Sequence, residues 1–157
     1  MPHSQKISHL ELDEKTLVRR SPQIEHERKV AIYDLLEENH FKPVEGLNGP
    51  YHVVLGILED RLQFDISDEG GQSLTFLTLS LKSFRGVIKD YFLICESYFE
   101  AIKTKAPSQI EAIDMGRRGL HNEGAELLRD RLVDKVDIDI DTARRLFTLI
   151  CVLHVRG

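Results

Sequence analysis

The chain has 157 residues, of which 41% are hydrophobic and 30% are charged, which suits one globular domain with a substantial core and excludes a disordered chain. The 26 acidic residues outnumber the 21 lysines and arginines and give a net charge of -5. Because non-specific nucleic-acid binding depends on clustered positive charge, this balance argues against nucleic acid as a partner.

The N-terminal half is predicted to contain an extended arm, one helix, a loop and three strands. Residues 1–20 form the arm, and Ser21-Pro22, a capping hydroxyl followed by proline, is a typical start for a helix that runs to about Asn39. Residues 41–50 hold two prolines and two glycines and are expected to be a loop. The three strands are expected at Tyr51 to Leu58, Arg61 to Ile66 and Leu74 to Leu81.

The second of these strands has the clearest pattern. Leu62, Phe64 and Ile66 alternate with polar residues, which is typical of a half-buried strand in an antiparallel sheet. Gly70-Gly71 marks the turn to the third strand, whereas Glu59-Asp60 is a poorer turn signal between the first two.

The C-terminal half is predicted to be mainly helical. Apolar residues between Phe84 and Ile102 recur at helical spacing, and Pro107 opens a further helix that ends near Leu132. Residues 136–140 alternate between apolar residues and aspartate, as in a short strand or an extended linker. Residues 142–154 are apolar almost all round, which indicates a helix in the core and leaves a buried strand as the alternative.

These elements predict an α+β fold with a single domain over residues 21–157. A small antiparallel sheet of three to four strands is expected to be covered by about four helices. The 1–20 arm precedes this domain.

The most informative segment is 111–125, where acids, arginines, a histidine and three glycines fall within a predicted helix. On a helical projection of about 100° per residue, Arg117 lies inside the apolar arc, and His121 lies at its margin one turn later. A buried cation needs a partner or a ligand, because an unpaired buried charge is too costly. The apolar arc consists of Ile110, Ile113, Leu120, Leu127 and Leu128.

Arginine binds phosphate and carboxylate in a bidentate manner, and histidine exchanges protons near neutral pH, so this helix is expected to form a binding site for an anionic group. The leading hypothesis is a non-catalytic binding or regulatory protein that recognises an anionic small molecule or a protein partner. The predicted binding residues are Asp114, Arg117, Arg118, His121, Asn122 and Glu123.

Two alternatives remain open. In the first, the protein is an enzyme acting on a small phosphorylated or carboxylated metabolite, with His121 as acid or base, Glu123 or Asp114 as its orienter, and Arg117 as the anion clamp. In the second, these residues form only an internal network of ion pairs, as structural networks often resemble functional sites.

Three glycines within nine residues of one helix call for a reason, because each costs up to about 1 kcal/mol relative to alanine. Gly116 and Gly124 lie in or beside the apolar arc and would allow close packing of two helices, within the chain or in a homodimer. Alternatively, Gly119 breaks the helix, and a second helix begins near Asn122.

No metal or cofactor is expected. Asp137-x-Asp139-x-Asp141 begins like a calcium loop, but the sixth position is Thr142 and the twelfth is Thr148, where glycine and glutamate are needed. A polar strand face with an acid that caps the last helix is the preferred interpretation. Suitable ligand types in the 111–125 segment also lack a metal-binding spacing: these are Glu111, Asp114, His121 and Glu123.

A cytoplasmic location without a membrane anchor is expected. The polar N-terminus leads into no apolar signal segment, and the longest apolar stretch, residues 146–155, is far shorter than the ~20 residues that span a bilayer. Cys95 and Cys151 lie in apolar segments and are expected to pack as free thiols in a reducing compartment. The same apolar setting argues against a nucleophile and base formed by Cys151 and His154.

Several long and unusual stretches of the sequence resemble one protein family. They are Ile24–Arg28, Ile32–Asn39, Ile88–Tyr98, Gln109–Gly124 and Asp141–His154. On these stretches the chain resembles uncharacterised protein family 0262, a family of small alphaproteobacterial proteins of unknown function, from about residue 24 to the C-terminus. The resemblance implies a bacterial cytosolic protein and assigns no activity, cofactor or catalytic residue, so no functional residue is carried over.

Overall fold

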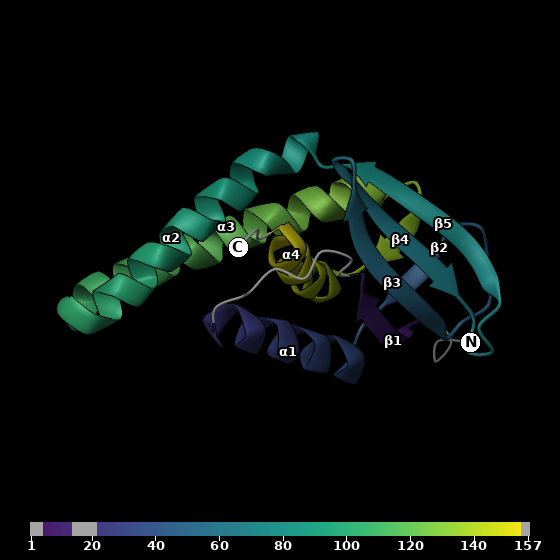
Figure 1. The fold of residues 1–157 in the computed structure, drawn as a ribbon, viewed down its shortest axis with the longest axis horizontal. Coiled ribbons are helices and arrows are strands. Elements are labelled where there is room, and N and C mark those ends of the chain that lie inside the picture. Colours follow the sequence, from purple (N-terminus) through teal and green to yellow (C-terminus); the bar gives the residue numbers. More distant parts are fainter. Residues whose placement is uncertain (1–4, 14–21, 155–157) are drawn as a thin grey trace.

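The computed structural model describes residues 5–13 and 22–154, which fold into one α+β domain with a four-stranded and a two-stranded sheet (Figure 1). In this part of the chain no helix is long and apolar enough to cross a bilayer. The elements are β1 (Ile7–Leu12), α1 (Pro22–Glu37), β2 (Phe41–Pro43), β3 (Tyr51–Leu58), β4 (Arg61–Ser67), β5 (Ser73–Ser80), the 3-10 helix η2 (Lys82–Phe84), α2 (Arg85–Thr104), α3 (Pro107–Leu132), β6 (Val136–Ile138) and α4 (Ile140–His154).

The larger sheet has the strand order β1-β3-β4-β5. Strands β3, β4 and β5 form the predicted antiparallel meander, with Val53 opposite Ile66 and Leu55 opposite Phe64. The alternation along β4 is confirmed, because Leu62, Phe64 and Ile66 are all fully buried. The core of the domain therefore lies on the face of the sheet to which these side chains point.

Strand β1 pairs with β3 in the parallel direction, so the sheet is mixed rather than purely antiparallel. Part of the segment expected as an arm is thus a strand of the sheet, whereas most of the rest of that segment and the predicted helix start at Ser21 lie outside the described residues. Asn39 joins β1 to the end of α1: its side chain accepts a bond from the Ile7 amide at 2.7 Å and donates to the carbonyls of Ile7 and Leu35.

The turn between β3 and β4 is formed by Glu59 and Asp60, which have φ angles of 51° and 62°. A two-residue hairpin turn of this kind requires positive φ at both positions, and glycine or asparagine usually supplies it. The predicted turn is therefore confirmed in spite of its poor sequence signal. Asp60 also anchors the neighbouring elements, because its carbonyl accepts from the Leu81 amide and its carboxylate pairs with Arg85.

The prediction that residues 41–50 are entirely loop was wrong at its beginning. Phe41–Pro43 form β2, which pairs with β6 in the antiparallel direction and places Phe41 opposite Ile138. Phe41 and Ile138 are both buried, so this small sheet belongs to the core. The strand pairing joins residues almost one hundred positions apart, and local turn signals carry no information about such a partner.

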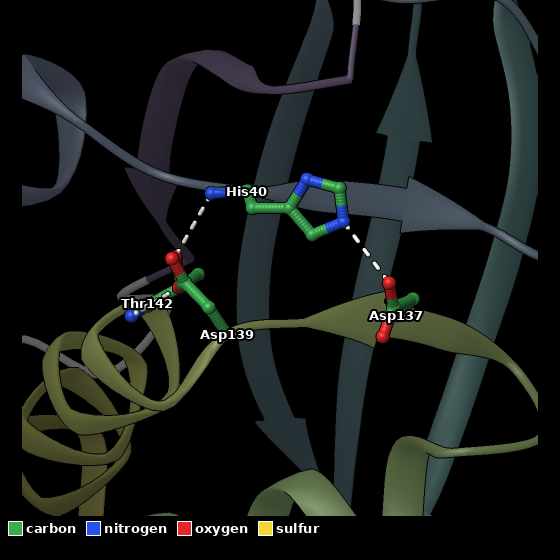
Figure 2. Close-up of polar contacts among 4 residues, drawn as sticks. All are labelled: His40, Asp137, Asp139 and Thr142. Atoms are coloured by element: carbon green, nitrogen blue, oxygen red, sulfur yellow. Dashed lines mark hydrogen bonds and ion pairs between the residues drawn. The ribbon is translucent and has the colours of Figure 1, made fainter. Parts of the chain in front are cut away.

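A small polar network links β2, β6 and the start of α4 (Figure 2). The Asp139 carboxylate accepts a bond from the Thr142 amide at 2.9 Å, which confirms the predicted capping acid. The hydroxyl of Thr142, which is fully buried, accepts a bond from the His40 amide at 3.0 Å, and the His40 ring lies 3.0 Å from Asp137. The aspartate-rich segment therefore fixes the first turn of α4 instead of forming a calcium loop.

The helices form a layer beside the sheet, with α4 in its centre (Figure 1). Helix α4 packs against α1, α3 and β3, and most of its residues are buried, as its sequence predicts. Helices α2 and α3 form a long antiparallel hairpin that extends away from the sheet (Figure 1). Helix α3 is continuous through Gly119, so the alternative of a break at this residue was wrong.

Two glycines of α3 permit close helix packing inside the chain. A Cβ atom on Gly124 would lie 2.2 Å from the Phe147 ring of α4, and one on Gly116 would lie 2.8 Å from the Ile94 side chain of α2. Gly119 differs from both, because a Cβ there would meet nothing within 4 Å. Close packing of α3 is therefore confirmed at two of its three central glycines. At Gly124 the neighbour is Phe147 of the same chain.

This contrast gives a matched pair of substitutions. Gly124→Ala should lower the free energy of unfolding by about 1–3 kcal/mol, because the fully buried Phe147 ring has no room to retreat. Gly119→Ala should raise it by up to about 1 kcal/mol, because alanine is the better helix former. Urea unfolding of both variants measures the difference, and equal effects would contradict the packing described for α3.

Candidate functional site

The predicted binding segment lies on the part of α3 that faces α2 and α4. Arg117 has the partners that its place in the apolar arc requires: its Nη2 lies 2.6 Å from Asp114 Oδ1, and its guanidinium carbon lies 4.2 Å from the centre of the Tyr98 ring. Arg118 Nη2 lies 2.7 Å from Asp114 Oδ2. One carboxylate thus holds two guanidinium groups, and their hydrogen bonds keep the pKa of Asp114 below its usual value.

His121 belongs to a different set of contacts. Its Nε2 lies 2.7 Å from the Thr148 hydroxyl, and that hydroxyl donates to the Arg144 carbonyl at 3.2 Å. If the Thr148 hydroxyl donates its single proton to the Arg144 carbonyl, His121 donates from Nε2, and Nδ1 carries no proton in that neutral tautomer. His121 thus lies outside the Asp114 ion pairs, and the pairing of Asp114 with both arginines agrees with the structural interpretation.

Three rings meet where α2, α3 and α4 come together. The ring centre of His121 lies 5.5 Å from that of Tyr91 and 5.7 Å from that of Phe147, and the Tyr91 and Phe147 centres are 6.0 Å apart. Such tilted and edge-on arrangements are favourable for aromatic groups. They place the His121 ring in an apolar setting on one side and beside polar groups on the other.

Burial in this setting, together with the positive charges of Arg144 and Arg117, lowers the pKa of His121 to about 4. His121 is therefore neutral near pH 7. Burial also raises the pKa of Glu27, a partly buried carboxyl group of α1, against the attraction of Arg117. The titratable groups around this site are thus shifted mainly by loss of contact with water.

The predicted residues line a cavity of about 380 Å³ between α2, α3 and α4. Three guanidinium groups face it and no carboxylate does. Four of the six predicted residues contribute to its wall, whereas Asp114 lies behind two of the arginines and Glu123 is exposed outside it. The complete lining is Tyr91, Arg117, Arg118, His121, Asn122 and Arg144.

Sequence reasoning missed the contribution of α4. Arg144 donates from Nε to the Asn122 side chain at 2.7 Å and from Nη1 to Asp141 at 3.0 Å, so it is held in position at the cavity. Arg144 and Thr148 are four residues apart on a helix whose residues are mostly buried. The same spacing places Arg117 and His121 on one face of α3, so it could also have indicated a polar face on α4. Tyr91, which belongs to the apolar stripe between Phe84 and Ile102, is 6% exposed and also lines the cavity.

Metal binding and cysteine catalysis have little support in the described ranges, 5–13 and 22–154. There, no three His, Cys, Asp or Glu side chains gather closely enough to hold a metal ion. Cys95 and Cys151 are free and buried, as predicted, and burial raises the pKa of the Cys95 thiol to about 11. Both thiols are therefore protonated near neutral pH and poorly nucleophilic.

Comparison with known proteins decides the family. A model of the uncharacterised protein family UPF0262 matches residues 4–156. The chain belongs to this family. The UPF0262 protein of Paramagnetospirillum magneticum is 61% identical to it over 157 residues, which is the full length of both. The UPF0262 protein of Rhodospirillum rubrum is 62% identical over 148 residues, covering 94% of this chain and 91% of the relative.

A third relative, the UPF0262 protein of Caulobacter vibrioides, is 59% identical over 152 residues, covering 97% of this chain and 94% of the relative. No solved structure matches the chain. UPF0262 membership therefore confirms the resemblance drawn from the sequence, and it assigns no reaction or ligand to the cavity.

The buried, neutral His121 predicts how stability depends on pH in this UPF0262 protein. Between pH 6.5 and about 4 the unfolded chain binds a proton at His121 that the folded protein excludes. The free energy of unfolding should therefore fall as the pH is lowered through this window, by on the order of 2–3 kcal/mol from this group alone. Urea unfolding at a series of pH values measures the slope.

Carboxyl groups titrate in the same window, so the contribution of His121 is the difference between the wild type and His121→Gln, which keeps a donor for Thr148. The variant should show a flatter pH dependence between pH 4 and 6.5. Identical slopes for the two proteins would contradict a neutral, buried His121.

Proposed function

We propose that this protein is a cytoplasmic, non-catalytic binding protein for a small anionic group, which enters the arginine-lined cavity between α2, α3 and α4. One observation carries the proposal: three arginines line a single cavity of about 380 Å³, with no aspartate or glutamate in its wall. Arginine is the residue best suited to bind carboxylate and phosphate, because its planar fork matches both groups.

Neighbouring polar side chains hold the arginines in position. Asp114 holds Arg117 and Arg118, while Asn122 and Asp141 hold Arg144. Nevertheless, donors remain available within the part of the chain that the structure describes: Nη1 of Arg117 and Nη2 of Arg144 make no hydrogen bond there. A ligand that meets fixed donors loses less free energy to ordering of the site, so this arrangement supports binding.

The cytoplasmic part of the proposal is supported by the two buried free thiols, which suit a reducing compartment. A free small molecule and a protein partner can both present such an anionic group, and the cavity chemistry is the same for both. A homodimer stays a separate prediction, and Gly124 would not mediate it, because Phe147 of the same chain already covers that residue.

Thermal melting with inorganic phosphate, pyrophosphate and citrate tests the anion site. An anion at about 100 times its dissociation constant should add about 2.7 kcal/mol to the free energy of unfolding, which is a shift of several degrees. The shift should disappear in Arg144→Ala and persist in Arg129→Ala, which removes an exposed arginine of α3 that does not line the cavity.

Each variant is compared with itself without anion, so a change in its intrinsic stability does not affect the result. Absence of any shift in the wild type at tens of millimolar anion would overturn the small-molecule proposal. Equal loss in both arginine variants would show that binding depends on overall charge rather than on the cavity.

The enzyme alternative keeps one supporting observation: His121 shares the cavity wall with the arginines. Its proposed orienters need correction, because Asp114 holds arginines, Glu123 is exposed, and Thr148 orients His121. If the cavity catalyses a reaction, the wild type should convert at least one phosphorylated or carboxylated metabolite that binds, as followed by NMR. His121→Gln should then lose about 100-fold or more in rate.

A further inference from the structure

A second cavity, of about 390 Å³, adjoins the arginine-lined cavity on the side of α1. The two share Tyr91, His121 and Arg144 in their walls. The second cavity differs in charge, because three carboxylates line it where the first has none: Glu27, Asp34 and Asp141. The two cavities thus form one cleft: the charged residues at its first end are all arginines, and its second end has three carboxylates beside Arg144 and Arg145.

The acidic end of the cleft has more carboxylates than guanidinium groups. Asp141 pairs with Arg144. The remaining carboxylates, Glu27 and Asp34, share this wall with Arg145 and His26. Among residues 5–13 and 22–154, nothing forms a hydrogen bond or ion pair with the Glu27 side chain. A partly buried carboxylate without such a partner is costly, and a cation in the cleft would relieve that cost.

The shared wall suits a ligand that reaches into both ends. Neutral His121 adds no positive charge between them, and Tyr91 presents an aromatic ring that is buried against His121 and Phe147. An ammonium group at the acidic end therefore meets three carboxylates, with the guanidinium of Arg145 also in the wall, and no charged imidazole at His121. Arg144 is the remaining cation of the shared wall, and Asp141 offsets its charge.

We infer that the ligand of the cleft is a small zwitterion, whose phosphate or carboxylate binds Arg117, Arg118 and Arg144 and whose ammonium group binds Glu27. This inference rests on the proposed anion site and adds the second charge of the ligand. The recognised class is a short amino acid or amino phosphate in which the two charges are separated by a few bonds. Charge-assisted bonds to both ends favour it over a simple anion by about tenfold or more.

Isothermal titration calorimetry with matched pairs tests the inference. O-phosphoethanolamine is compared with ethyl phosphate, and β-alanine is compared with propionate, so that each pair differs in the amino group. The wild type should bind at least one zwitterion about tenfold more tightly than its partner without the amine. Glu27→Gln should remove this preference and leave the affinity for the simple anion within about twofold.

Glu38→Gln is the matched control, because Glu38 is an exposed carboxylate that follows α1 and lines neither cavity. It should keep the full preference for the zwitterion. Equal affinities within every pair would overturn the inference and leave the anion site intact. Failure of all four probes to bind, together with no response to inorganic phosphate, would overturn the inference and the proposed function together.

Discussion

The contact between Phe147 and the backbone of α3 at Gly124 determines where the cleft residues lie. A side chain at Gly124 would overlap the Phe147 ring, so the two helices approach as closely as their backbones permit. His121 lies one turn before Gly124 and Thr148 directly follows Phe147, so the same contact brings these two side chains to 2.7 Å. The Phe147 ring also contacts Tyr91 and His121, which line both cavities.

The central position of α4 explains why its few polar residues gather in one place. Most of the helix is buried against α1, α3 and β3, and a buried charge without a partner is too costly. Arg144 and Thr148 therefore lie in the gap between α1 and α3, where Asp141, Asn122 and His121 satisfy them. The cleft thus lies where polar side chains of α1, α3 and α4 meet beside the apolar core.

Structural and functional interpretations of the arginine cluster both describe part of the site. The pairing of Asp114 with Arg117 and Arg118 is what an internal ion-pair network requires. However, one carboxylate does not neutralise two guanidinium groups, and the excess positive charge faces a cavity. The adjoining cavity is lined by three carboxylates and by two arginines, Arg144 and Arg145, so negative charge is in excess there. Separation of opposite excess charges within a single cleft is the feature that a purely structural network does not explain.

The sequence by itself determined the helices, the meander and the residues of α3 that need partners, because periodicity and capping depend on near neighbours in the chain. The boundaries of α3, from Pro107 to Leu132, and the alternation along β4 followed from such local patterns. Only the tertiary structure decided the β2–β6 pairing, the parallel strand β1, and the contributions of Arg144 and Glu27 to the cleft. These features join segments far apart in sequence, and packing of distant surfaces, rather than local preference, selects which of them meet.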